Sequence, residues 1–517
     1  MKSIYKLNNI FSVSVTQVIA FWLVIFVVPS SFANEGTGNN SMLLQNSIAV
    51  LPFENSSPNP DDAYFAAGIY RNILNELEDI GNMNVIFPAT VARFIGSDKS
   101  LPEIASELNV ETVMKGNVSY SDNRFNISVQ LIEGSSNKPL WSENYERDLS
   151  DVMAVQAEII KNIAKTLGVK LSAAEQERIE KTPTASLEAY THYLMAMQLY
   201  SAGPVKKPAF YQHLDQAIAA DPKFALVHAI KANDYAYAKL AHVPVGASHG
   251  GAAPDSTSNN LSFEEMEKIA LEHAGIALEL NPKQAIAYKA QASIHRSNMN
   301  SPDARERYDR AFELSPAIYY SVSTLYYFSV TGDYDNAIKV AQRLLDLGPN
   351  VAVNHDNLGW VLLNAGNHAA AAEQYRLAIA LKPKFHRQHT NLGLAEIVLG
   401  NNEEGLNQIR TAEQLQSSAG KGPNSLMAYG YARLGLKDDA MRVVNDLQVR
   451  DAKGEKMRPY ARAVANLAIG EADKAYDILA QKPNEGLHYF QVMKSNMMKD
   501  PLLEEPRFIE IRNQSGW

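Results

Sequence analysis

The chain of 517 residues contains no cysteine, which excludes disulfides, thiol catalysis, thiolate metal sites and lipid attachment through an amino-terminal cysteine. It also lacks any run rich in lysine and arginine, and its formal net charge of -9 offers no electrostatic footprint for a nucleic-acid backbone. The sequence holds no G-x-S-x-G, P-loop or G-x-G-x-x-G motif. We therefore expect a protein that is not an enzyme, with no catalytic residues, no cofactor, no metal ion and no nucleic-acid partner.

The amino terminus has the pattern of an export signal. Lys2 and Lys6 precede an apolar stretch from Ile10 to Val28, and the small residues Ser31 and Ala33 fit a signal-peptidase site. The alternative is an uncleaved membrane anchor, because an apolar stretch of this length is close to what a bilayer requires. The sequence leaves the two alternatives open.

Both alternatives predict the same location for the rest of the chain. With residues 1–33 as signal peptide or anchor, residues 34–46 form a polar spacer and residues 34–517 lie outside the cytoplasm. The expected location is the periplasm or the outer side of the inner membrane, and any membrane contact is expected through the amino-terminal segment alone.

Short apolar runs and helical patterns alternate over residues 47–181, which predicts a small α/β domain. Residues 124–132 alternate between apolar and polar side chains, as in a half-buried antiparallel strand. Asp61 and Asp62 are expected to cap a helix that continues to Ile80. The other predicted strands are 47–53, 85–87, 112–120 and 140–146, and the other predicted helices are 89–95, 102–108 and 152–167.

Several short motifs in this region resemble the TolB amino-terminal-like domain. They are Ile48–Phe53, Asp62–Ile69, Ile104–Leu108, Lys115–Gly116, Val129–Ile132 and Leu140–Tyr145. In that family the domain commonly lies just outside the membrane, between a transmembrane helix and a tetratricopeptide array, and a winged-helix domain or a nucleotide cyclase often lies on the cytoplasmic side. Only nine residues precede the apolar stretch here, so we expect neither cytoplasmic domain.

The second half of the chain repeats with a period of 34 or 35 residues, marked by Gly332, Gly366, Gly400, Gly435 and Gly470. Such a period indicates stacked helix-turn-helix units. The clearest unit, residues 352–383, resembles the tetratricopeptide consensus. The predicted fold class is therefore α+β overall, with the small α/β domain followed by an all-α superhelical solenoid.

The predicted domain boundaries follow from these repeats. Residues 182–487 form an array of about eight units, a loop insertion lies near residues 241–262, and residues 488–517 form a carboxy-terminal cap.

The first helices of successive units line the concave side of such a solenoid, where a peptide can bind. The inward positions form the predicted groove: Ile286, Tyr319, Tyr326, Val353, Asp356, Asn357, Trp360, Arg387 and Asn391. Asparagine at equivalent positions could bind a peptide backbone, and Arg387 could hold a carboxylate. The alternative is that these side chains only pack or solvate the groove.

Two other groups of residues have simpler explanations. The aromatic residues Tyr319–Tyr320 and Tyr326–Phe328 are expected to pack between helices. The histidines, including the pairs His386/His389 and His355/His368, have no metal-ligand spacing and are expected to be ordinary surface or packed side chains.

These observations favour an exported scaffold or adaptor that binds a protein or peptide of the cell envelope. The alternative is a sensory module in which the α/β domain binds a small ligand or envelope signal and relays it to a partner.

Overall fold

The computed structural model describes six stretches of the chain: residues 44–200, 207–242, 261–297, 301–454, 459–481 and 505–514. Every described residue belongs to one compact unit, Leu43–Trp517. The predicted signal or anchor, most of the spacer and most of the loop insertion therefore lie outside the described residues. Among the described helices, none is both long and apolar enough to span a membrane.

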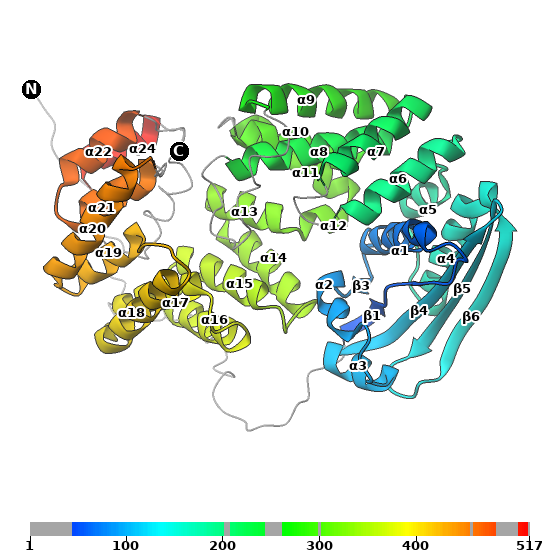
Figure 1. Ribbon diagram of the computed structural model, residues 1–517, viewed down its shortest axis with the longest axis horizontal. Coiled ribbons are helices and arrows are strands. Elements are labelled where there is room, and N and C mark those ends of the chain that lie inside the picture. The colour runs from blue at the N-terminus through cyan, green and yellow to red at the C-terminus, as the bar shows by residue number, and fades with distance from the viewer. Residues whose placement is uncertain are drawn as a thin grey trace, which may run out of the picture. The chain divides into compact units, whose positions relative to one another are not determined.

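The α/β domain is built on a mixed six-stranded sheet in the order β3-β1-β4-β5-β6, with β2 paired to β4. β1 lies parallel to β3 and β4, whereas β4, β5 and β6 are antiparallel neighbours. Figure 1 shows these last three strands side by side, with β6 outermost. The strands are β1 (Leu44–Val50), β2 (Glu54–Asn55), β3 (Asn84–Val85), β4 (Val110–Ser121), β5 (Arg124–Glu133) and β6 (Pro139–Asp148). The helices are α1 (Ala63–Glu78), α2 (Pro88–Val91), α3 (Leu101–Leu108), α4 (Val152–Thr166) and α5 (Ala173–Glu180), with 3-10 turns η1 (Pro60–Asp62), η2 (Ala92–Phe94) and η3 (Leu149–Asp151).

The alternation in β5 divides the sheet into a buried and a polar face, as predicted. Phe125, Ile127, Val129 and Leu131 are buried against α1 and α4 in one hydrophobic core. The opposite face packs on α2 and α3 near β1 and the start of β4, where Val113 is buried. Further along β4, β5 and β6, this second face carries polar and charged side chains instead.

The prediction that Asp61 and Asp62 cap the first helix is wrong. Asn59 provides the capping oxygen, which accepts a hydrogen bond from the backbone of Asp61 (3.2 Å), while the Asp62 side chain makes no capping bond. The reason is that α1 continues from the 3-10 turn η1, whose Pro60 carbonyl accepts the next backbone N–H. The true start of the helix therefore lies one turn earlier than the apolar pattern indicates.

The rest of the chain forms helix pairs, which confirms the predicted helical-repeat region and the α+β fold class. In the described residues the pairs are α6 (Leu187–Leu199) with α7 (Lys207–Ala220), α8 (Ala225–His242) with α9 (Phe263–Leu280), α10 (Ala285–Ser297) with α11 (Ser301–Leu314), α13 (Val322–Thr331) with α14 (Tyr334–Asp346), α15 (Ala352–Asn364) with α16 (His368–Leu381), α17 (His386–Leu399) with α18 (Asn402–Ser418), α19 (Ser425–Arg433) with α20 (Lys437–Ala452) and α21 (Pro459–Ala468) with α22 (Ala472–Gln481). Two further helices are α12 (Pro316–Tyr319) and α24 (Pro506–Gln514). Figure 1 shows the pairs following one another along the chain.

The recurring glycines end the first helices of five successive pairs. Each has a φ between +76° and +87°, the left-handed region that favours glycine. After Gly366, for example, the backbone N–H of Asn367 donates to the carbonyl of Leu362 (2.8 Å), as a Schellman motif requires. The period seen in the sequence therefore arises from one repeated helix termination.

The α/β domain and the first repeats share a hydrophobic core. Leu194 and Phe210 lie in the same cluster as the buried face of the sheet. α1 and α6 approach closely at Gly68, where an added Cβ would lie 2.7 Å from the Cβ of Leu194. Farther along the array, Asp79 accepts a hydrogen bond from the Ser315 side chain and forms an ion pair with Arg178 (3.2 Å). The core thus passes from the sheet into the array without a break at residue 182.

Candidate functional site

The predicted groove residues lie mainly on α15 and α17, the first helices of two neighbouring repeats. Arg387 forms an ion pair with the carboxylate of Asp356, and these side chains are 14% and 2% exposed. Burial lowers the pKa of Arg387 to about 9. Arg387 is therefore already paired within the chain, although its Nε and Nη1 atoms and Oδ1 of Asp356 have no hydrogen-bond partner among the described residues.

Asn357 and Asn391 occupy equivalent positions on α15 and α17, and both are buried, at 1% and 8% exposed. Asn391 lies beside the hydroxyl of Tyr375, whose pKa is raised by burial and lowered in part by this neighbour. Both asparagines are therefore buried inside the array. A bound peptide could reach them only if side chains above them moved.

The solvent-accessible groove positions are largely apolar. Val353 is 39% exposed, and Trp360, Ile286 and Tyr319 are half-buried. The Tyr319 hydroxyl donates to the side chain of Asn336 (2.9 Å). The side chain of Tyr326 lies outside the described side chains. The α15 part of the groove therefore offers apolar contact from Val353 and Trp360 above buried polar groups.

The aromatic residues pack between helices, as expected, but not on one helix. The first helix, α12, ends at Tyr319, and a separate helix, α13, begins at Val322. Ser321 starts α13 by accepting a hydrogen bond from the backbone of Thr324 (3.4 Å). Tyr327 and Phe328 are buried on α13, and the Tyr319 ring contacts Phe328 edge-on.

Three histidines play a structural role that their spacing from a proline in the sequence could have revealed. His355 and His389 are buried at equivalent positions, and each bonds through Nε2 to a proline carbonyl six residues earlier, at 2.8 and 2.9 Å. Each Nδ1 lies within hydrogen-bond distance of a glutamine on the second helix, Gln374 or Gln408. His228 makes the same contact with the Pro222 carbonyl (3.1 Å). The repeated sequence signal is a proline followed six residues later by a histidine. The hydrogen bond between the two connects the turn before each first helix to that helix.

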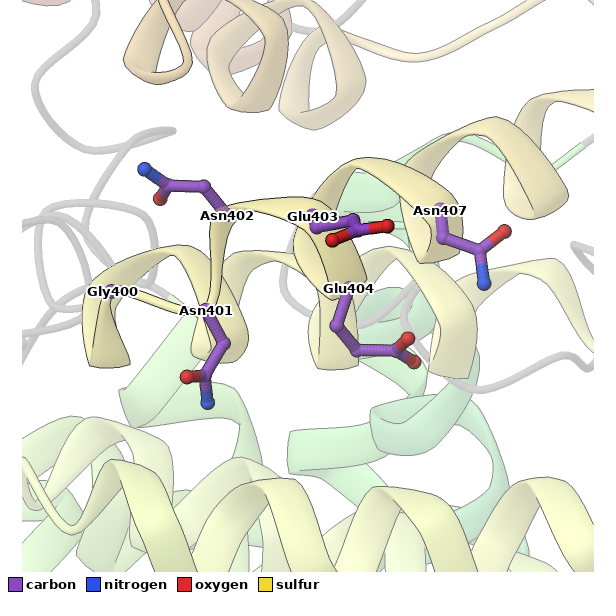
Figure 2. A pocket seen from close by; sticks show the side chains of 6 residues that line it. All are labelled: Gly400, Asn401, Asn402, Glu403, Glu404 and Asn407. Atoms are coloured by element: carbon purple, nitrogen blue, oxygen red, sulfur yellow. The ribbon is translucent and has the colours of Figure 1, made fainter.

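A surface hollow of about 670 Å³ lies away from the predicted groove, at the turn between α17 and α18. Figure 2 shows its side chains around this turn, with the carboxylates of Glu403 and Glu404 on the first turn of α18. None of the predicted groove residues lines it. Across the part of the chain that the structure describes, no cluster of three or more His, Cys, Asp or Glu residues could hold a metal ion.

A family model described as the second domain of HilA/YgeH-like transcriptional regulators matches residues 44–166. This range contains the whole sheet and α1 to α4. The match covers the region in which the sequence resembles the TolB amino-terminal-like domain, but it does not show that resemblance. The finer assignment to the TolB-like family stays a prediction.

A protein of Rhizobium meliloti (strain 1021) named putative adenylate cyclase 3 is 34% identical to this chain over 184 residues. The alignment covers 35% of this chain and 31% of the relative, so the chain spans less than a third of that protein's length. The activity in its name is that of the relative.

Solved structures with some similarity include two tetratricopeptide proteins. One, YrrB, is described as having an unusual peptide-binding site; it is 19% identical, with a TM-score of 0.29 over 40% of this chain and 92% of its own. The other, from Parabacteroides merdae ATCC 43184, is 17% identical, with a TM-score of 0.34 over 47% of this chain and 94% of its own. These scores are low, and the helical-repeat region rests on the chain's own helix pairs.

Proposed function

We propose that this protein is a non-enzymatic scaffold or adaptor of the cell envelope, and that the first helices of its repeats bind an extended segment of a protein partner. The observation that carries the proposal is the arrangement on α15 and α17. Accessible apolar side chains of α15 lie on the same helix as buried polar residues, and a buried ion pair joins α15 to α17. Val353 and Trp360 supply the apolar contact, and the pair of Asp356 with Arg387 fixes the two helices relative to each other.

The chemistry of this surface favours a partner that is mainly apolar at the point of contact. Because Arg387 is already neutralised by Asp356, a carboxylate of the partner would have to compete with a buried ion pair. Apolar side chains of an extended peptide do not have to compete with this ion pair, and they can be buried against the side chains of Val353 and Trp360. We therefore place the apolar contacts at the centre of recognition and the polar groups in support.

We further propose that the amino-terminal segment exports residues 34–517, and that the front domain belongs to the TolB amino-terminal-like family. The basic residues before the apolar stretch and the absence of cysteine support export. Amino-terminal sequencing of the mature protein and protease accessibility in spheroplasts test this location. A chain that is protected from protease until the membrane is dissolved would contradict it.

The structure offers a matched pair of variants for the binding proposal. Val353 on α15 and Leu377 on α16 are both large apolar residues, 39% and 40% exposed, but one lies on a first helix and the other on a second helix. Val353→Glu should abolish recovery of partners cross-linked in cells, because a carboxylate would face the apolar contact. Leu377→Glu should leave the recovery unchanged. Equal behaviour of the two variants, with both folded by circular dichroism, would contradict the proposal.

A further inference from the structure

The sheet of the α/β domain ends in a long strand whose outer edge is free among the described residues. β6 runs from Pro139 to Asp148 at the end of the sheet order, and eight of its ten residues are exposed. The other edge strand, β3, has two residues. An exposed edge of this length is a template for pairing with another strand, and proteins usually cover or protect it.

The hydrogen-bond pattern shows which residues of β6 face outward. The backbone N–H of Leu149 donates to the carbonyl of Asn123 (2.9 Å), next to the pair formed by Arg124 and Asp148. Bonded and non-bonded pairs alternate along an antiparallel ladder, so the odd-numbered residues of β6 bond to β5. The even-numbered residues Ser142, Asn144 and Glu146 therefore present their backbone groups to the outside.

The charges on β6 differ between its two faces. On the polar face, Glu146 and Asp148 both pair with Arg124 of β5, at 3.4 and 3.7 Å. On the other face, Glu143 and Arg147 are exposed, and neither forms an ion pair with another described residue. Glu143 accepts a hydrogen bond from the Tyr145 hydroxyl (3.0 Å), and Arg147 donates to the carbonyl of Glu146 (2.9 Å). One acidic and one basic residue thus flank Tyr145 symmetrically.

We propose that β6 pairs with β6 of a second copy of this chain, antiparallel and centred on Tyr145, to join two sheets into one. In this register Asn144 and Glu146 of one copy form backbone hydrogen bonds with Glu146 and Asn144 of the other. Glu143 of each copy then lies opposite Arg147 of the other, in a non-bonded pair whose side chains are about 4.5–5.5 Å apart at Cβ.

The alternative registers are less favourable. Only the even-numbered residues of β6 present backbone N–H and C=O groups to the outside. One copy of the strand can therefore slide along the other only in steps of two residues. A shift by two residues in one direction places Glu146 opposite Glu146, and a shift by four residues in the other direction places Glu143 opposite Glu143. Like charges directly opposite destabilise a sheet. A register centred on Asn144 avoids repulsion but forms no ion pair, because Glu143 then faces Tyr145. Charge complementarity therefore selects the register centred on Tyr145.

A charge-exchange experiment tests this pairing in the full chain. Sedimentation of the detergent-solubilised protein at low ionic strength should show a dimer. Glu143→Arg and Arg147→Glu should each shift it to monomer by at least tenfold in dissociation constant, and the double variant E143R/R147E should restore the dimer. Lys115→Glu, an exposed residue on the polar face of β4, is the matched control and should remain dimeric. A monomeric wild type, or a dimer that ignores both single reversals, would overturn the proposal.

A cross-linking experiment provides a second test if a reversed charge prevents folding. Because the chain has no cysteine, the double variant N144C/E146C carries the only thiols. In the proposed register the thiol introduced at position 144 of each copy faces the thiol introduced at position 146 of the other, at a Cα separation of about 5.5 Å, which a disulfide can bridge. Mild oxidation in whole cells should give a covalent dimer, and N144C alone should react at least fivefold more slowly. Equal or faster reaction of N144C alone, or no dimer with either variant, would overturn the register or the pairing.

Discussion

Arg387 on α17 forms an ion pair with the buried carboxylate of Asp356 on α15, so the first helices of two neighbouring repeats are joined by opposite charges. This pair has two consequences. It fixes the spacing of the helices beneath the accessible apolar residues, and it removes Arg387 from the set of free cations that a partner could use. Removing one of the two charges should therefore destabilise this part of the array more than removing both.

Asp356→Ala should lower the free energy of unfolding by about 3 kcal/mol, because the change leaves a largely buried guanidinium without its counter-charge. Removing both charges in D356L/R387M should recover most of the loss, since apolar side chains of similar size can replace a buried pair. Guanidinium denaturation followed by circular dichroism measures both variants. A single variant as stable as the wild type would show that the pair contributes little.

Gly366→Ala should destabilise the array by about 1–2 kcal/mol, the cost of a left-handed conformation for a residue with a Cβ. Gly366 has a φ of +81°, in the left-handed region that favours glycine. Gly366→Asn should therefore be milder, because asparagine tolerates this conformation better. Thermal unfolding of the two variants gives the comparison, and equal losses would argue against the backbone explanation.

Gly68→Ala should separate α1 from α6 and weaken the joint between the sheet and the array by roughly 1–3 kcal/mol, as overpacking does. The Cβ added at position 68 would lie 2.7 Å from the Cβ of Leu194. Gly275→Ala on α9 is the matched control, because nothing lies within 4 Å there, and it should stabilise the helix by up to about 1 kcal/mol. Melting temperatures that move in the same direction would contradict this view of the joint.

The histidine pair between α8 and α9 should make the first repeats sensitive to acid. Nδ1 of His228 and Nδ1 of His273 are 2.8 Å apart, and burial, with Lys231 and His228 adding to it, lowers the pKa of His273 to about 4. A pKa that is lower in the folded state means that the unfolded chain takes up the proton first.

Stability should therefore be fully present above pH 6.5 and fall as the pH decreases toward 4, by about 2 kcal/mol for this partly exposed group. His273→Gln should flatten this dependence. Denaturation midpoints at intervals between pH 7 and pH 4 provide the measurement. A variant with the same slope as the wild type would show that other groups cause the acid sensitivity.

Much of the fold could be predicted because local patterns determine it. The alternation of Phe125, Ile127, Val129 and Leu131 gave the strand and its buried face, and recurring glycines gave the helix terminations. Both patterns depend on residues that are close in sequence. The start of α1 was missed because a 3-10 turn capped by Asn59 carries no apolar period.

The candidate site was harder to predict, because contacts between repeats decide it. The position of Arg387 on its helix follows from the sequence, but its pairing with Asp356 depends on how α15 and α17 pack across 31 residues of chain. Burial of Asn357 and Asn391 has the same origin. The proline-to-histidine contacts could have been found, since their spacing of six residues recurs in the sequence.

Site-specific photo-cross-linking in cells tests the central claim most directly. A photoreactive amino acid at Val353 would report what contacts the first helix α15, and the same residue at Leu377 would report the second helix α16. The account predicts a discrete cross-linked partner from position 353, lost when Trp360→Ala is added, and none from position 377. Adducts of equal yield from both positions, or from position 377 alone, would contradict it.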